Sequence, residues 1–348
     1  MRNGAQLLQK PPSQRGEGHV SGRGSVEDRL QHFARLQPAK GKFVQHHLTP
    51  QKIGALAHLA MLSEVSATPK PGLVDRMTNG AHDDMDFFTF LASATALRTS
   101  FDTFAELGRA HAKEPVSALL PHLQAAGIIA ERQMFAATHG VNTHKGMIFS
   151  LGLLSGVAGW VGACGESITA EHLCELVSEL THGLTAVACE EARQKPASER
   201  TKGEAMYVKY GVTGVRGEAE QGFPSVRRIA LPVYRARRGE GASVNDALVD
   251  TLLALIAGTT DTNILGRHDM EALHYAQAAA KRVQSLGSMK TPEGRKALIA
   301  LDTDFTQRWL SPGGSADLIA VTHFLYEVEG NKPRQTVSNV VYSEEKSF

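Results

Sequence analysis

From Met147 to Cys164 the chain carries no charged side chain, and this run limits what the protein can form. A charge-free run of this length approaches that of a membrane span. Four glycines and two serines interrupt it, however, and small residues let neighbouring helices pack closely. We therefore expect a buried helix inside a soluble globular protein and not a segment that crosses a bilayer.

From Thr49 onward the apolar spacing is overwhelmingly helical, and no stretch shows the convincing alternation of a strand. Capping residues and prolines mark helix starts. The expected helices run from Thr49-Pro50 to about Ser66, from Thr169 to about Arg193, from Ser243 with its capping partner Asp246 to Gly258, onward from Thr291-Pro292, and onward from Ser315. The sequence predicts an all-α fold. We expect a single multi-helix globular domain over residues 49–329, with its active site built from inter-helix loops and helix N-termini.

The two ends of the chain differ from this domain. Residues 1–48 hold eight Lys and Arg against three Asp and Glu, are poor in large apolar side chains and show no helical period. This composition predicts a flexible basic N-terminal extension, and nothing in it resembles the apolar region of a secretory signal. Residues 330–348 lose the helical period and are expected to form a C-terminal tail.

Composition narrows the protein's partners and surroundings. A formal net charge of +1 argues against generic nucleic-acid binding, for which a basic domain is expected. The three cysteines, Cys164, Cys174 and Cys189, are scattered, so they make neither a disulfide framework nor a CxxC metal pair. We therefore expect a reducing compartment, and the cytoplasm is the default location.

Five polar, glycine-bearing junctions separate the expected helices, and loops on a rigid scaffold are where function concentrates. They are residues 70–86, 140–146 (GVNTHKG), 203–224, 260–269 (TDTNILGRHD) and 310–317 (LSPGGSAD). The third contains YGVTGVRGEAEQGFP, which lacks the GK[ST] ending of a Walker A loop and follows no strand. If the protein uses a nucleotide, the usual phosphoryl-transfer apparatus is missing.

Two junctions have features of anion sites. His144 and Lys145 fall in the first turn of a helix, where a cation is unfavourable unless an anion binds at the same end. An ordinary solvated lysine is the alternative. In LSPGGSAD two glycines permit close approach of a ligand, although Ser315 and Asp317 would also make a good helix start without one.

The first junction is strongly acidic. The aspartates within residues 83–86 precede an apolar run, so one or two of them are explained as helix caps. Asp75, His82 and the nearby Glu64 are not explained in this way. Clustered carboxylates suit Mg²⁺ held mostly through water and substrate phosphates, and they do not resemble the closed Cys and His set of a zinc site.

Five motifs occur in order along the chain: E…KPGLVDR…NGAHDDMD, NTHKG…FSLG, G…RGEA…GFP, DTNIL and LSPGGSADLIA. In this order they resemble the triphosphoribosyl-dephospho-CoA synthase family, over roughly residues 49–329. Enzymes of that family join ATP to 3′-dephospho-CoA and release adenine, so ATP acts as a ribosyl donor, in agreement with the missing Walker motif. Their product is the prosthetic-group precursor of citrate lyase or malonate decarboxylase, and the sequence does not choose between the two.

The resemblance implies roles for residues of the junctions. An acidic centre would contain Glu64, Asp75, Asp83, Asp86 and Asp261, with His82 as a base or ligand. Phosphate groups would be bound by Lys70, His144, Lys145 and Arg216, and hydrogen bonds would come from Asn79, Asn142, Asn263 and Ser315. The expected cofactor is Mg²⁺, with Glu64, Asp83 and Asp86 as its ligands.

The implied substrates are ATP and 3′-dephospho-CoA, and the product would pass to a separate transferase and an acyl carrier protein. No nucleic acid or membrane is implied, and a homodimer is left open. Two functions of other classes also stay open: a non-catalytic regulator that binds a nucleotide or CoA, and a metal-dependent hydrolase of nucleotides or ADP-ribose. Adenine release that depends on dephospho-CoA separates the synthase from both.

Overall fold

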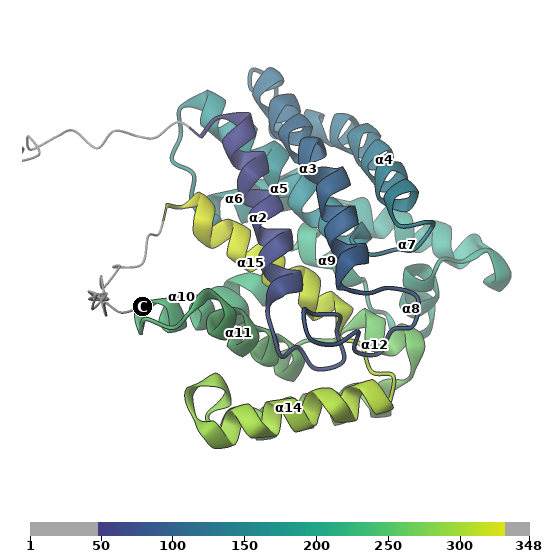
Figure 1. Cartoon of the computed structure of the whole chain (residues 1–348). Helices are drawn as coiled ribbons and strands as arrows, with labels where there is room; N and C mark the ends of the chain where they lie inside the picture. Colours follow the sequence, from purple (N-terminus) through teal and green to yellow (C-terminus); the bar gives the residue numbers. More distant parts are fainter. Residues whose placement is uncertain (1–47, 331–348) are drawn as a thin grey trace, which may run out of the picture. The chain divides into compact units, whose positions relative to one another are not determined.

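The computed structural model of the protein describes residues 48–330. Within this range it has fourteen α-helices and no β-strand, joined by loops and short helical turns (Figure 1). The predicted all-α class is confirmed. Apart from residues 48 and 330, the expected N-terminal extension and C-terminal tail lie outside the described residues.

In the described range the N-terminal half consists of α2 (Pro50–Ser66), α3 (Phe87–Ala110), α4 (Leu120–Ala137), α5 (Lys145–Cys164), α6 (Ala170–Leu180) and α7 (Leu184–Gln194). The C-terminal half consists of α8 (Lys202–Tyr210), α9 (Gly214–Glu220), α10 (Leu231–Gly239), α11 (Val244–Gly258), α12 (Thr262–Arg267), α13 (Met270–Ser285), α14 (Pro292–Gln307) and α15 (Gly313–Val328). The short segments are η1 (Val116–Leu119), η2 (Ala197–Glu199), the π-helical η3 (Val226–Ala230) and η4 (Ser288–Lys290).

Helix α5, which contains the charge-free run, belongs to the core of the N-terminal half. It packs against α2, α3, α4 and α15, and Figure 1 shows the axes of α2, α3 and α4 roughly parallel, with the chain running in opposite directions along α2 and α3. Among the described helices, α5 is the one that is long and apolar enough to cross a membrane, but 72% of its apolar window is buried inside the protein. The expectation of a buried core helix is confirmed.

The glycines of α5 allow it to lie close to α3. A β-carbon at Gly159 would stand 2.0 Å from the carbonyl oxygen of Ala105. In the other direction, a β-carbon at Gly108 of α3 would stand 1.8 Å from the carbonyl oxygen of Gly156. The two backbones can approach this closely only because these positions carry no side chain.

Helix α11 is the centre of the C-terminal half. Every residue from Ala247 to Ala257 is buried, and the helix packs against α10, α13 and α15. Helix α15 also contacts α2 and α5, so it joins the two halves. Helix α14 packs on α13 and lies at the lower edge of the molecule in Figure 1.

Most of the expected helix starts are confirmed. The side chains of Thr49, Ser243 and Thr291 each accept a hydrogen bond from a backbone N–H of the following turn, as N-caps do. Asp86 caps α3 and forms a capping box with Thr89. One of the aspartates within residues 83–86 is therefore a helix cap, as expected.

The prediction of a single helix from Thr169 to about Arg193 is wrong, because this segment forms two helices, α6 and α7. Gly183 adopts a left-handed conformation with φ of 80° at the break. The carboxylate of Glu220, from α9, accepts hydrogen bonds from the backbone N–H groups of Gly183 at 2.6 Å and Thr185 at 3.0 Å. A distant side chain thus starts α7, and a local pattern does not reveal it.

Two further boundaries are corrected. The junction expected over residues 203–224 is largely helical, because α8 and α9 occupy most of it. Ser315 does not cap α15, since the helix already begins at Gly313 and Ser315 lies within its first turn.

Candidate active site

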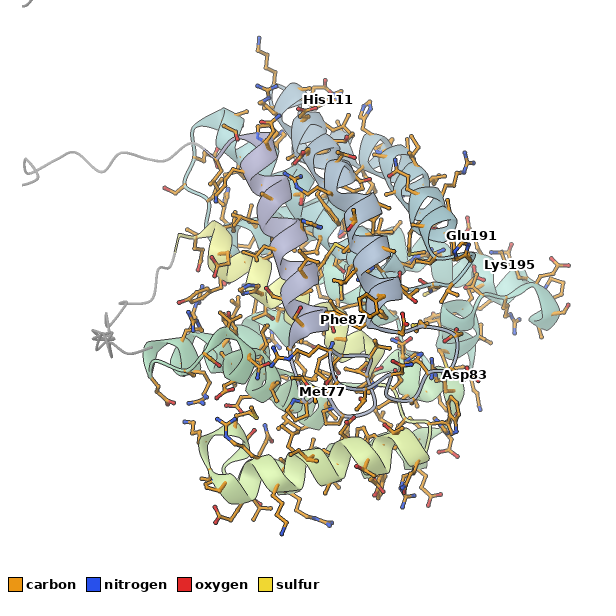
Figure 2. The ribbon with its side chains drawn as sticks, viewed as in Figure 1. Met77, Asp83, Phe87, His111, Glu191 and Lys195 are labelled. Carbon is orange, nitrogen blue, oxygen red and sulfur yellow. The ribbon has the colours of Figure 1, made fainter. Side chains whose placement is uncertain are left out.

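The loop between α2 and α3 lies at one end of α3. Figure 2 shows Met77 and Asp83 on this loop and Phe87 at the start of the helix, whereas His111 marks the opposite end. The five polar junctions recognised in the sequence converge at the Phe87 end.

The junction of residues 70–86 contacts the junction of residues 310–317. His82 Nε2 lies 2.9 Å from Ser311 Oγ. A β-carbon at Gly72 would stand 1.9 Å from the Leu310 carbonyl oxygen, so the two backbones touch. Segments more than two hundred residues apart in the chain therefore form one surface.

The junction of residues 260–269 bridges these two. Asp261 Oδ2 accepts hydrogen bonds from the backbone N–H and the hydroxyl of Ser315, at 2.8 and 2.9 Å. Arg267 Nη1 donates to the carbonyl oxygen of Ala81 at 2.9 Å.

The remaining two junctions reach the same region. The space beside Gly146 in GVNTHKG is filled by Asp317 Oδ2, which lies 1.9 Å from where a β-carbon of residue 146 would stand. A β-carbon at Gly214, at the start of α9, would lie 3.3 Å from the side chain of Thr262. All five junctions are thus linked by direct contacts.

Asp75 organises the α2–α3 loop. Its side chain is 1% exposed, and its carboxylate accepts hydrogen bonds from the Thr68 hydroxyl at 2.7 Å and from the backbone N–H groups of Lys70, Met77 and Thr78 at 3.0, 2.7 and 3.0 Å. Four donors occupy most of the accepting capacity of a carboxylate. Asp75 therefore holds the shape of the loop, and its expected catalytic part stays a prediction.

Asp302 of α14 supports the same loop and is missed by the sequence analysis. Its Oδ1 accepts a hydrogen bond from the Gly72 backbone N–H at 3.0 Å, and its Oδ2 accepts one from the Thr78 hydroxyl at 3.4 Å. Burial raises the pKa of Asp302, and these hydrogen bonds oppose the rise. No signal in the sequence distinguishes this aspartate from others in amphipathic helices.

Glu64 and Lys70 form a buried ion pair. Lys70 Nζ donates to Glu64 Oε1, and the lysine and glutamate side chains are 1% and 2% exposed. Burial raises the pKa of Glu64, and attraction to Lys70 opposes that rise. Oε2 of Glu64 is buried and has no hydrogen-bond partner within the described residues. Lys70 thus neutralises Glu64 in this structure, whereas the sequence analysis placed it on a phosphate.

His144 is fully buried at the start of α5. Its Nδ1 lies 2.7 Å from Ser93 Oγ, which accepts a hydrogen bond from Thr143 Oγ1 at 2.8 Å. Burial, aided by the charge of Lys70, lowers the pKa of His144 to about 3, so the ring is neutral. It can donate a hydrogen bond but offers no positive charge to a phosphate.

Nε2 of His144 is buried and has no partner within the described part of the chain. An unpaired buried polar atom is costly, so such a group marks a place where a ligand or water would be favourable. The ring edge is fixed by Phe90, whose ring centroid lies 4.9 Å from that of the histidine.

Asp261 joins the starts of α12 and α15. Its Oδ1 accepts hydrogen bonds from the backbone N–H groups of Asn263 at 2.9 Å, Ile264 at 3.3 Å and Gly314 at 3.4 Å, in addition to the two that Oδ2 accepts from Ser315. Burial raises the pKa of Asp261, and these hydrogen bonds oppose the rise. The anion at the start of α15 is therefore the protein's own carboxylate, where the sequence suggested an external ligand.

His82 is held from two sides. Besides Ser311 on Nε2, Nδ1 lies 3.2 Å from Arg267 Nη2 and 3.6 Å from Asp84 Oδ1. Burial lowers the pKa of His82, and the positive charge of Arg267 lowers it further. The ring is therefore neutral near pH 7. A neutral ring is the form that a base requires, but both of its nitrogens already have partners.

The other residues assigned to ligand binding are accessible. Exposed side chains are those of Asn79, Asp83, Asn142, Lys145, Arg216 and Asn263. Lys145 Nζ lies 2.9 Å from Glu131 Oε2, and Asn142 Oδ1 accepts a hydrogen bond from the Lys145 backbone N–H at 3.2 Å. Asn142 thus supports the start of α5.

The expected magnesium ligands are not gathered around a common point. Glu64 is buried against Lys70, Asp83 is exposed, and Asp86 Oδ1 accepts hydrogen bonds from the backbone and the hydroxyl of Thr89 at 2.8 and 2.7 Å. Across residues 48–330, no group of three or more His, Cys, Asp or Glu side chains is arranged to hold a metal ion. These residues do not form a metal centre of their own.

Asp317 is an acid of this region that the sequence analysis does not assign to the site. It lies beyond the first turn of α15 and points toward the start of α5 at Gly146. Burial raises the pKa of Asp317 well above its usual range, and the nearby carboxylates of Glu64 and Asp261 add to the rise. The one signal in the sequence is an aspartate that opens an otherwise apolar helical run, DLIAVTHFLY.

Comparison with known proteins identifies the family. The family model described as ATP:dephospho-CoA triphosphoribosyl transferase matches residues 50–336. A probable 2-(5″-triphosphoribosyl)-3′-dephosphocoenzyme-A synthase of Vibrio cholerae serotype O1 is 45% identical over 279 residues, which cover 80% of this chain and 88% of the relative. The 2-(5″-triphosphoribosyl)-3′-dephosphocoenzyme-A synthase of Pectobacterium atrosepticum is 43% identical over 271 residues, or 78% of this chain and 87% of the relative.

No solved structure matches the chain. The region that the family model matches includes all five junctions that meet at the site. The chain therefore belongs to the ATP:dephospho-CoA triphosphoribosyl transferase family.

Proposed function

We propose that the protein transfers the 5-triphosphoribosyl group of ATP to the 2′-hydroxyl of 3′-dephospho-CoA and releases adenine. Membership of the family supports this activity. The structural observation that carries it is the convergence of five distant junctions, linked by the contacts of His82, Asp261, Gly146 and Gly214.

The chemistry of this transfer matches the composition of the site. Breaking the bond between adenine and the anomeric carbon places positive charge on the ribose, and buried carboxylates stabilise such charge strongly. The carboxylates of Glu64 and Asp261 both lie within electrostatic reach of Asp317 in the fold. Lys145, at the start of α5, is an accessible cation, and its position at a helix N-terminus supports a role in binding the phosphate groups of ATP.

The proposal includes Mg²⁺, which would bind together with ATP. The ion usually keeps several waters and binds through substrate phosphates with one or two carboxylates, so it needs no dedicated protein cage. This fits a site in which the described residues provide no preformed metal centre.

The product would pass to a separate transferase and then to the acyl carrier protein of citrate lyase or malonate decarboxylase. A cytoplasmic location is supported by the cysteines, all three of which are free thiols in the structure.

Incubation of the protein with ATP, Mg²⁺ and 3′-dephospho-CoA is expected to yield free adenine and a product that keeps all three phosphates of ATP. Mass spectrometry measures both. The physical reason is that the site combines buried carboxylates with phosphate-binding positions but has no Walker motif for phosphoryl transfer. ADP or pyrophosphate as the main product would refute the proposal.

The same assay separates the other two classes of function. A regulator that only binds nucleotides releases no adenine under any condition. A hydrolase uses water as the acceptor, so it releases adenine at the same rate when dephospho-CoA is omitted. Strict dependence of adenine release on dephospho-CoA is the expected result.

Lys145→Ala is expected to raise the KM for ATP while leaving the turnover number nearly unchanged. A charged hydrogen bond to phosphate contributes about 1.5–3 kcal/mol, which corresponds to roughly a ten- to hundredfold change in affinity. Steady-state kinetics with varied ATP measures the effect. The matched control is Lys281→Ala, which removes an exposed lysine from α13. Equal KM values for the two variants would remove Lys145 from the ATP site.

A further inference from the structure

The carboxylates of the site differ in how many hydrogen bonds and ion pairs they make with the rest of the protein. Asp75 and Asp261 accept four and five hydrogen bonds, Glu64 pairs with Lys70, and Asp86 caps a helix. These contacts tie the four side chains to the structure of the loops. Asp75 and Asp261 therefore have little capacity left for a reacting substrate, whereas Glu64 Oε2 still has no partner within the described residues.

Asp317 is the exception. It makes no hydrogen bond or ion pair within residues 48–330, although it lies deep in the fold and keeps only part of its surface accessible. Its Oδ2 faces Gly146, at the point where a side chain on that residue would collide with it. A carboxyl with both oxygens unused at the meeting point of the family's motifs is suited to contact a substrate.

Two neighbouring groups support a ligand position here. Nε2 of His144, the residue before the first turn of α5, is fully buried without a partner, and so is Oε2 of Glu64. A buried ring nitrogen and a buried carboxylate oxygen are therefore both unsatisfied in the described structure. Each would gain a partner if a polar ligand reached it.

We propose that Asp317 is a catalytic residue, whose carboxyl group gives a proton to adenine as the base leaves the ribose of ATP. This inference rests on the proposed function. The bond from the anomeric carbon to the 2′-oxygen of dephospho-CoA forms, and the bond from that carbon to adenine N9 breaks with its electron pair going to adenine. Asp317 protonates a ring nitrogen of the base. The resulting carboxylate then takes up the proton that the attacking 2′-hydroxyl loses, so the residue ends as it began.

The surroundings favour the protonated form that this role requires. The charges that act on Asp317 are those of Glu64 on α2 and Asp261 at the start of α12, and both are negative. His144, at the start of α5, is neutral. The pKa of Asp317 is therefore raised by burial and by like charges, with no cation among the causes.

Asp317→Asn tests the proposal, because asparagine keeps the shape but has no acidic proton. With ATP, turnover is expected to fall by about 10²- to 10⁴-fold, the usual contribution of general acid catalysis. With ATP methylated at adenine N7, the base already carries a positive charge and leaves without protonation. The variant is then expected to approach the wild-type rate. Equal losses on both nucleotides would overturn the proposal, since a structural defect does not depend on the leaving group.

Gly146→Ala provides a second variant that leaves Asp317 chemically intact. The new β-carbon would lie 1.9 Å from Asp317 Oδ2, so the carboxyl must move. Turnover with ATP is expected to fall, again with recovery on the N7-methylated nucleotide. Gly127→Ala in α4 is the matched control, because nothing lies within 4 Å of its β-carbon position. Wild-type turnover with ATP in both Asp317→Asn and Gly146→Ala would contradict the inference.

A measurement on the wild-type protein guards against a variant that does not fold. Turnover with ATP is expected to decline as the pH rises and Asp317 loses its proton, whereas turnover with the N7-methylated nucleotide is not. The same decline on both nucleotides would contradict the role. Failure of the wild-type protein to release adenine from ATP under any condition would instead refute the proposed function itself.

Discussion

Lys70→Met is expected to lower the free energy of unfolding by about 3–5 kcal/mol, the usual cost of removing one partner of a buried ion pair. Lys70 and Glu64 are 1% and 2% exposed, so the carboxylate that remains is cut off from water. Its second oxygen already has no partner within the described residues. Denaturant unfolding at neutral pH, followed by circular dichroism, measures the loss.

The loss in Lys70→Met should depend on pH in a defined direction. Burial raises the pKa of Glu64, and without Lys70 nothing of opposite charge in the pair offsets that rise. Below the ordinary range of a glutamate pKa the carboxyl is protonated in the folded and the unfolded chain, so the penalty is absent. It grows as the pH rises through that range toward the raised pKa of the folded protein. The variant should therefore lose less stability at about pH 4 than at about pH 8.

Two controls test this explanation. Adding Glu64→Gln to Lys70→Met removes the uncompensated charge and should recover much of the stability. Lys290→Met breaks the ion pair between Lys290 and Glu240, whose side chains are 50% and 48% exposed, and should change stability little. A pH-independent loss, or no recovery in the double variant, would show that the ion pair is not the cause.

Gly159→Ala is expected to destabilise the protein by about 3 kcal/mol or more, at or above the upper end of the usual cost of overpacking. The added β-carbon would stand 2.0 Å from the carbonyl oxygen of Ala105 and 3.0 Å from its Cα, so α3 and α5 must separate. A flexible side chain can give way to such an intrusion, but the backbone of a packed helix cannot. The free energy of unfolding in denaturant is the measurement.

The same substitution in α4 should have the opposite sign. Gly127 also lies in a helix, but nothing is within 4 Å of its β-carbon position. Alanine there gains helix propensity of up to about 1 kcal/mol and meets no obstacle. If Gly159→Ala were as stable as Gly127→Ala, the close contact between α3 and α5 would be absent from the protein in solution.

The sequence predicted the helices well where their signals are local. Thr49, Ser243 and Thr291 each lie directly before a helix and cap it, because an N-cap needs only its own next turn. The buried character of α5 was likewise visible in its composition. The break between α6 and α7 was not predictable, since the side chain that starts α7 is Glu220, which lies outside both helices.

The sequence predicted which loops form the site, but it did not predict the role of each side chain in them. Asp75, Asp261 and Asp317 are all acids within family motifs, and nothing in the one-letter sequence separates them. In the structure the first two are surrounded by donors, whereas Asp317 has none. His144 looked like a cation for phosphate, but complete burial makes its ring neutral.

The sequence by itself determined the all-α class, most helix starts, the buried nature of α5 and the family, because helical period, caps and ordered motifs are properties of short segments. The tertiary structure alone decided which acids are committed to loop shape and which one keeps its oxygens unused. Gly72 receives its partner Asp302 from 230 positions further along the chain, and Gly146 meets Asp317 from a different helix. Protonation and hydrogen bonding depend on such distant neighbours and on exclusion of water, neither of which is encoded in a local pattern.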